Sequence, residues 1–485
     1  MGKLIKLMLV VCLTISSTVI ASDKTKAPLK QVLFKNVHVW DGTSEGLTKK
    51  INVLVEDNLI KKVRAKDSDA QKDALVIDGK GMVLMPGLID QHVHLSTFLP
   101  LQTHSRDMLH PYAHGALAVT RANEILMNGY TTVRDLGGPA NYLRQIIDEG
   151  VAPGPRIYPT ENWITTTSGH GDFRELNDPH PNIAGGRQHF YEDYVTIIAD
   201  GPDETTRAVR EAFRRGATQI KLFTSGGVTS LFDPLHSGPN DEEIQAAVKV
   251  AKKWDTYVAT HSFSEEAIMQ ALDNGVLSIE HAPFLTNKAA KKIIDKGAFL
   301  ATAVSPVLAI DVEYARKTYP PQSFKKWKVV RDAALNMLEV LKNNPDLKFC
   351  IGSDLLGPWN NLKATDDKMN LEFKFFPKYV GNLRTLKAAT STAGELNAMT
   401  GKMNPYKDGP LGVVKEGAYA DLLLVDGNPL KNIELMLDPD KKFKVIMKDG
   451  VIYKNTLLHE MITPDLRNKI KKTIPHMYGD YNYIE

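Results

Sequence analysis

The chain has 485 residues, of which 43% are hydrophobic and 24% are charged, and its formal net charge is +3. These values are typical of a soluble globular protein that buries a large core. The charge is small and no segment is dense in lysine and arginine, so the composition argues against a nucleic acid as the partner.

The first segment differs from the rest of the chain. Lys3 and Lys6 precede an apolar run over 7–15, and small residues surround Ala21. This pattern predicts a signal peptide over 1–21 that is cleaved near Ala21, and hence a secreted or periplasmic protein. The apolar run is short for a bilayer, so no stable membrane span is expected. After cleavage only Cys350 remains, which excludes an internal disulfide.

Both ends of the remaining chain have the pattern of antiparallel strands. Between 31 and 83, short β-like runs alternate with Asn, Asp and Gly turns, and the same texture returns between 420 and 451. We therefore predict a small β-sandwich domain built from residues 22–85 and 401–455. Residues 456–485 are then a C-terminal tail.

The insert over 86–400 has a different rhythm, in which helical patterns lead repeatedly through Gly or Asn into short apolar strands. Such units predict an α/β domain with a parallel sheet, most economically closed as a (β/α)8 TIM barrel. A doubly wound open sheet is the alternative, but no Gly-x-Gly-x-x-Gly turn follows the first strand.

The first strand of this insert ends in the segment MPGLIDQHVHL, residues 85–95. His92 and His94 are two positions apart, so on a strand both rings point to one face and can reach one metal ion. By itself the pair could also be a chance feature of a strand that contains histidine.

Barrel active sites collect the residues that close each strand. Four further residues of the ligand or acid–base type close predicted strands of the insert: Lys221, His261, His281 and Asp354. The order of the four histidines, the lysine and the aspartate resembles the amidohydrolase superfamily, as do the segments TTVRD (131–135), SIEH (278–281), GSD (352–354) and GPLG (409–412). The pattern is most similar to the binuclear-metal subgroup related to imidazolonepropionase and to the Xaa-Pro dipeptidase-like and ochratoxinase-like amidohydrolases.

The resemblance implies two divalent metal ions, with zinc as the expected metal. His92, His94 and Asp354 would bind one ion, and His261 and His281 the other. A lysine ammonium cannot bind a metal, but a carbamate on Lys221 would offer two oxygens and bridge the pair. A Schiff-base lysine or a plain strand-end charge is the alternative for Lys221, and a loop cap is the alternative for Asp354.

Further residues are expected around the substrate. His170 lies in a Gly-His-Gly segment like that of the Xaa-Pro dipeptidase-like enzymes, which implies a catalytic histidine that faces the substrate; the alternative is a loop histidine without a role. Gly227 and Val228 are expected to bring the backbone close to substrate. Arg134 is predicted to form a structural ion pair outside the site, and His114 to be a polar surface or loop residue.

The predicted function is metal-dependent hydrolysis of an amide bond, in a dipeptide or an N-acyl amino acid, by a metal-bridging hydroxide, with Asp354 carrying the proton to the leaving amine. The resemblance extends this to dipeptidase, carboxypeptidase-like or ochratoxin-hydrolysing activity on a small-molecule substrate. The alternatives are a mononuclear cyclic-amide hydrolase or deaminase, and a non-catalytic barrel used for binding. Similar barrels often form dimers or rings, so the resemblance allows a homo-oligomer.

Overall fold

The computed structural model describes residues 31–97, 111–172, 174, 177–184, 194–230, 235–236, 238–354 and 369–457. The predicted signal peptide over 1–21, and all but the first two residues of the predicted tail, lie outside these ranges. Within them no helix combines the length and the apolar character that crossing a membrane requires.

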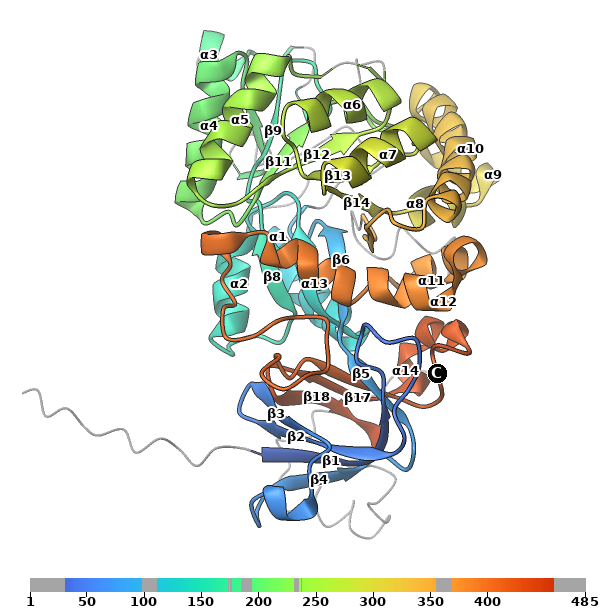
Figure 1. The fold of residues 1–485 in the computed structure, drawn as a ribbon. Coiled ribbons are helices and arrows are strands. Elements are labelled where there is room, and N and C mark those ends of the chain that lie inside the picture. The colour runs from blue at the N-terminus through green and yellow to red at the C-terminus, as the bar shows by residue number, and fades with distance from the viewer. Residues whose placement is uncertain are drawn as a thin grey trace, which may run out of the picture.

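Strands from the two ends of the chain form one eight-stranded sheet, seen as the blue and red arrows in the lower part of Figure 1. Its strands are β1 (Gln31–Val39), β2 (Ile51–Glu56), β3 (Leu59–Val63), β4 (Leu75–Asp78), β5 (Val83–Pro86), β16 (Leu422–Val425), β17 (Phe443–Lys448) and β18 (Val451–Asn455). The order along the sheet is β18-β17-β16-β5-β1-β2-β3, and β4 pairs with β1.

The two halves of this sheet are joined through β1, whereas a sandwich of two separate sheets was expected. A register irregularity between Phe34 and Val37 divides β1, so that its first half pairs with β2 and β4 and its end pairs with β5. Alternate side chains of both halves, among them Phe34, Val53 and Leu424, pack into one buried cluster.

Above this sheet lies the helix and strand insert. Eight strands alternate with helices in a TIM-barrel-like order: β6 (Leu88–Val93), β7 (Tyr130–Asp135), β8 (Arg156–Pro159), β11 (Ile220–Phe223), β12 (Val258–Ser262), β13 (Ser278–His281), β14 (Phe299–Thr302) and β15 (Phe349–Ile351). Two short strands that the sequence did not indicate, β9 (Trp163–Thr165) and β10 (Thr196–Ile198), lie between β8 and β11 in the chain.

All pairings in the insert are parallel, in a three-stranded sheet β6-β7-β8 and a seven-stranded sheet β10-β9-β11-β12-β13-β14-β15. The ladders stop between β15 and β6 and between β8 and β11. At the first join the Asp354 amide donates to the His92 carbonyl at 2.8 Å, and at the second the Thr218 amide donates to the Pro159 carbonyl at 2.7 Å. The two sheets therefore contact each other at these two places without a continuous ladder; β15 is an edge strand of the seven-stranded sheet, whereas β11 lies inside it, between β9 and β12.

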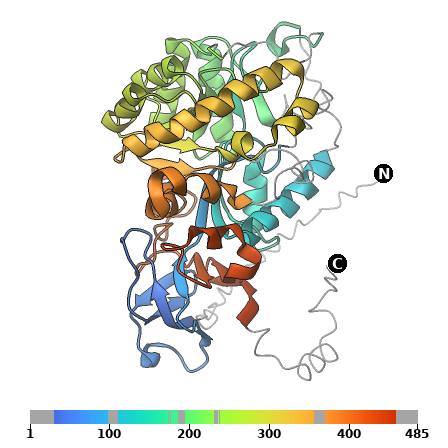
Figure 2. The same cartoon turned by 90° about the vertical axis from the view of Figure 1, so that its right-hand side faces the viewer.

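Helices surround the strands of the insert, as the two views in Figures 1 and 2 show. They are α1 (Pro111–Met127), α2 (Ala140–Asp148), α3 (Pro181–Ala184), α4 (Pro202–Arg215), α5 (Asp241–Lys253), α6 (Glu265–Asp273), α7 (Asn287–Asp295), α8 (Ser305–Leu308), α9 (Val312–Thr318), α10 (Pro321–Asn343), α11 (Glu372–Phe375), α12 (Pro377–Ala388) and α13 (Ser391–Ala398). A further short helix, α14 (Pro439–Lys442), lies beside β17 of the eight-stranded sheet. Their buried faces and the outer faces of the strands form the largest apolar core.

Candidate active site

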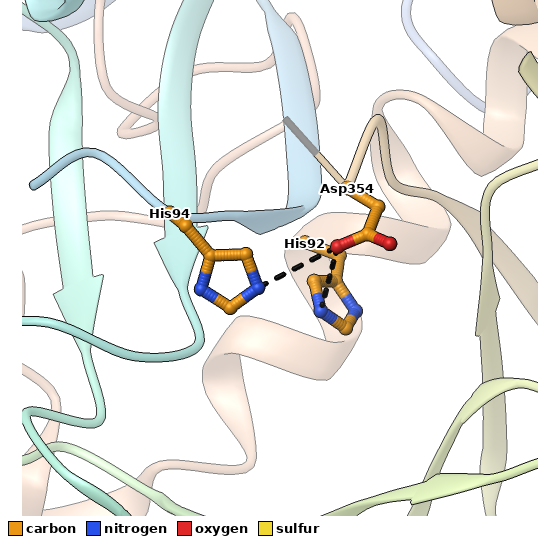
Figure 3. A group of neighbouring side chains, drawn as sticks. All are labelled: His92, His94 and Asp354. Carbon is orange, nitrogen blue, oxygen red and sulfur yellow. Dashed lines mark ion pairs between the residues drawn. The ribbon is translucent and has the colours of Figure 1, made fainter. Parts of the chain in front are cut away.

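His92 and His94 lie at the end of β6, and Asp354 follows β15 next to them (Figure 3). One oxygen of Asp354, Oδ1, lies 3.6 Å from Nε2 of His92 and 3.5 Å from Nε2 of His94. Ligands about 2.1 Å from a tetrahedral zinc ion lie about 3.4 Å from one another. The ligand atoms of the three residues, which all lie within 4.8 Å of one another, therefore fit one metal ion.

The backbone that places Asp354 is unusual in two respects. Asp354 has a left-handed conformation, with φ of 50°, which aspartate tolerates better than most residues. Two residues earlier, a Cβ on Gly352 would lie 2.5 Å from Cβ of His92, so only glycine permits the close approach of β15 to β6. His281 also has a positive φ, of 68°. Strain of this kind is concentrated at functional sites.

Three of the histidines have their second ring nitrogen held by an oxygen that accepts a hydrogen bond. Nδ1 of His92 donates to the Glu280 carboxylate at 2.9 Å, and Nδ1 of His94 to the Gly137 carbonyl at 3.2 Å. Nε2 of His261 donates to the Gly226 carbonyl at 3.0 Å. A neutral ring that donates from one nitrogen keeps a lone pair on the other. These hydrogen bonds leave the other nitrogen of each ring available for a metal ion.

Lys221, His261 and His281 line one cavity. His92, His94 and Asp354 line the same cavity. Nζ of Lys221 lies 3.4 Å from Nε2 of His92, and the rings of His261 and His281 have centroids 4.6 Å apart. Burial lowers the pKa of the Lys221 ammonium to about 8, which favours the neutral amine that a carbamate requires. Burial also lowers the pKa of His281 to about 3, and holds those of His92 and His261 well below their ordinary values, so these rings are neutral.

Asp354 differs from the histidines in its charge. Burial acts to raise its pKa, but His281, His94 and Lys221 together bring the pKa below its ordinary value. The carboxylate is therefore ionised near neutral pH and can accept a proton.

The ring of His170 stacks on the ring of His261, with centroids 4.3 Å apart. Its Nδ1 lies 2.6 Å from Oγ of Ser230, a residue that the sequence analysis did not single out. A Cβ on Gly227 would lie 2.7 Å from the His170 ring, so this glycine lies directly behind the histidine. Burial lowers the pKa of His170 to about 3. His170 is thus a neutral ring in the cavity wall.

The rest of the cavity wall is mainly apolar and comes from two sides. Val228 lines it near His170, whereas Gly227 is not among the lining residues. A second group of lining residues comes from the segment between β14 and β15: Pro306, Val307, Ile310, Tyr319, Trp327, Val330 and Met337. A cavity that combines a polar cluster with apolar walls is the usual form of a small-molecule site.

Comparison with known proteins identifies the family. A sequence model described as the Amidohydrolase family matches residues 83–454. The chain belongs to the amidohydrolase family. Ochratoxinase from Aspergillus niger is 29% identical over 388 residues, which cover 77% of this chain and 76% of that protein.

Solved structures of amidohydrolases agree with this assignment. An amidohydrolase crystal structure has a TM-score of 0.78 and 32% identity, and covers 88% of this chain and 100% of its own. A prolidase complexed with N-methylphosphonate-L-proline has a TM-score of 0.77 and 31% identity with the same coverage. These neighbours confirm a TIM-barrel-like fold with a second domain, and the resemblance to the ochratoxinase-like and Xaa-Pro dipeptidase-like subgroup.

Two further residues of this amidohydrolase were considered from the sequence. Arg134 forms a structural ion pair, as expected; its partner is Glu280, which in turn contacts His92. His114, expected at the surface or in a loop, is only 2% exposed, because helix α1 begins at Pro111 and turns this residue toward the carbonyl of Ser96, 3.3 Å from its Nδ1. The prediction for His114 is wrong.

Proposed function

We propose that this amidohydrolase hydrolyses the amide bond of a dipeptide or an N-acyl amino acid and depends on two divalent metal ions, with zinc as the expected metal. His92, His94 and Asp354 would hold one ion, His261 and His281 the other, and a carbamate on Lys221 would bridge them. The observation that carries the proposal is the convergence of all six side chains on one cavity. When bound, such a metal pair activates a water molecule and polarises the amide carbonyl.

Asp354 is the proposed carrier of the proton. Its ionised carboxylate takes a proton from the attacking water and transfers it to the amide nitrogen, which then leaves as an amine. Its position beside His92 and His94 supports this role, because a water molecule held by metal ions at these histidines would be within reach of the carboxylate.

His170 is the proposed contact to the substrate. Ser230 holds Nδ1, so the ring orientation is fixed and Nε2 is left to meet the amide carbonyl or its neighbour. Val228 lines the cavity, and Gly227 lies directly behind the His170 ring. These residues would orient the amide between the polar cluster and the apolar wall.

The apolar wall supports a substrate with an apolar side chain next to the scissile bond. Ile310, Tyr319 and Trp327 lie on this wall, and Trp327 is fully buried. The names of the relatives indicate proline dipeptides and the ochratoxin amide as the first compounds to test. Both are consistent with a free carboxylate on the substrate.

The remaining predictions belong to the same proposal. Cleavage near Ala21 would deliver the enzyme to the periplasm or the medium, and residues 22–85 with 401–455 would form a domain beside the barrel domain over 86–400. Strand pairing between β5 and β16 supports that composite domain, since it joins the two segments.

The test is metal analysis together with a substrate panel. Protein purified without chelator is analysed for metals and incubated with Xaa-Pro dipeptides, N-acyl amino acids and ochratoxin, and the released amines are quantified. We expect about two metals per chain and release of amine, both lost in Lys221→Ala but retained in Lys249→Ala, whose lysine is exposed on α5.

Other outcomes would replace the proposal. One metal per chain, unaffected by Lys221→Ala, with turnover of cyclic amides or deamination, would indicate a mononuclear enzyme. No metal and no turnover of any compound would indicate a binding protein.

A further inference from the structure

Glu280 lies at the centre of a buried hydrogen-bond network beneath the metal-ligand cluster. On β13 it points to the same side as Ser278, two residues earlier, whose hydroxyl donates to Oε1 at 2.6 Å. Oε2 accepts from Nδ1 of His92 at 2.9 Å. The Glu280 side chain has no exposed surface. Its carboxylate is therefore anchored by several donors, one of which is the histidine.

Arg134 binds this carboxylate, and its guanidinium is also fully buried. Its Nη2 donates to Oε1 and Oε2 of Glu280, at 2.8 and 2.9 Å. Its other donors reach three acceptors, at distances between 2.7 and 3.1 Å: the Gln91 carbonyl, the Tyr257 hydroxyl and the Ser278 hydroxyl. The arginine thus links β6, β7, β13 and the residue that precedes β12, and has little freedom to move.

A buried ion pair is weak evidence for stability, because the cost of removing both charges from water offsets their attraction. Arg156 forms a second buried pair, with Asp421, and also contacts Asp449. Among the residues that the structure describes, no histidine hydrogen-bonds or ion-pairs with Asp421 or Asp449, and neither they nor Arg156 line the cavity. What distinguishes the Glu280 pair is its contact with a proposed metal ligand.

We propose that Glu280, held by Arg134, is a positioning residue that fixes the His92 ring and its tautomer, so that Nε2 presents a lone pair to the metal site. This inference rests on the proposed function, since it assigns a role toward the proposed metal ions. Partners of this kind change metal affinity by roughly 10- to 100-fold when removed.

The chemistry of the amide predicts what Glu280→Gln does. If the glutamine NH2 faces Arg134, two donors confront each other in a buried place. If the NH2 faces His92, Nδ1 must become the acceptor and the proton moves to Nε2, which then has no lone pair for a metal. The first arrangement keeps the His92 tautomer but loosens the anchor of its partner, and the second removes the lone pair, whereas Asp421→Asn breaks a comparable pair without touching a histidine.

The test is titration of chelator-treated protein with Co²⁺, followed by visible absorption and by competition with a chelator. We expect the wild type to bind two ions, and Glu280→Gln to bind one of them about 10- to 100-fold more weakly, with a changed absorption spectrum. Asp421→Asn should keep the affinity and the spectrum of the wild type. Thermal unfolding of the metal-free proteins shows how far each variant is destabilised.

Wild-type affinity and spectrum in Glu280→Gln would overturn the inference, as would an equal loss of affinity in Asp421→Asn. If Glu280→Gln does not fold, Arg134→Lys decides by the same criteria, because it keeps the charge but removes the two-pronged contact. A wild type that binds no cobalt would overturn the proposed function and this inference together. Two ions bound by both wild type and Glu280→Gln, with equal affinity, would overturn only the inference.

Discussion

Replacement of Asp354 by asparagine tests the proposed proton transfer most directly. Asparagine has nearly the same size and also tolerates the left-handed conformation that Asp354 adopts at φ 50°. The fold around β15 should therefore survive. The amide oxygen can still approach Nε2 of His92 and His94, which lie 3.6 and 3.5 Å from the carboxylate oxygen, but an amide cannot accept the proton.

A positioned acid–base group contributes about 10²- to 10⁴-fold to a reaction rate, which corresponds to roughly 3–5 kcal/mol of barrier. We expect kcat of Asp354→Asn to fall within this range for the best substrate of the panel. The assay is release of amine at saturating substrate, with metal content and unfolding temperature measured on the same preparation. Asp57→Asn is the matched control, because Asp57 is an exposed aspartate with a left-handed conformation, φ 53°, in the turn between β2 and β3.

A variant that keeps its metals and more than about a tenth of the wild-type kcat would refute the proton-carrier role, because the loss would lie below the range for acid–base catalysis. Loss of activity together with loss of metal would instead assign Asp354 to metal binding alone.

Three further substitutions have separate expected outcomes. Gly227→Ala should lower kcat/KM at least about tenfold, because the new Cβ would lie 2.7 Å from the His170 ring and displace it. Gly46→Ala is the control and should leave kcat/KM unchanged, because a Cβ at Gly46 would have no atom within 4 Å. Trp327→Phe should lower kcat/KM for substrates with aromatic side chains more than for those with glycine, measured as the ratio of the two; an unchanged ratio would remove Trp327 from the substrate wall. Glu372→Gln should raise the free energy of unfolding at pH 8 but not at pH 5, measured in denaturant. Burial raises the pKa of Glu372 from 4.5 to about 7, so the folded protein binds the proton more tightly than the unfolded chain. The free energy of unfolding of the wild type therefore falls between pH 5 and pH 8, by up to about 3 kcal/mol. An equal difference in stability between variant and wild type at both pH values would contradict this.

The candidate ligands were predictable from the sequence because each lies in a strand or within three residues after its end. The period of two on a strand places His92 and His94 on one face, and parallel strands bring their ends to one edge. Lys221 and Asp354 could be recognised in the same way. For these residues, local sequence and the fold class together determine the position.

Residues that act through pairing across the barrel could not be predicted in this way. Arg134 and Glu280 meet although β7 and β13 belong to different sheets, and no local pattern encodes that contact. Likewise β9 and β10 lie in a polar stretch without alternation, and tertiary pairing rather than propensity makes them strands. Ser230 meets His170 only because two loops converge.

The pairing of β5 with β16 also determines when the site can form. Pro86 pairs with Leu422, near the opposite end of the chain, and β6 with His92 begins only two residues after Pro86. Contacts between such distant segments form late and slow the search for the native state. During synthesis β5 can pair with β1, which precedes it, but it lacks its other partner, β16, until almost the whole polypeptide has been made. A nascent or truncated chain therefore lacks part of the support for its histidine strand, and metal capture should follow completion of the chain rather than precede it.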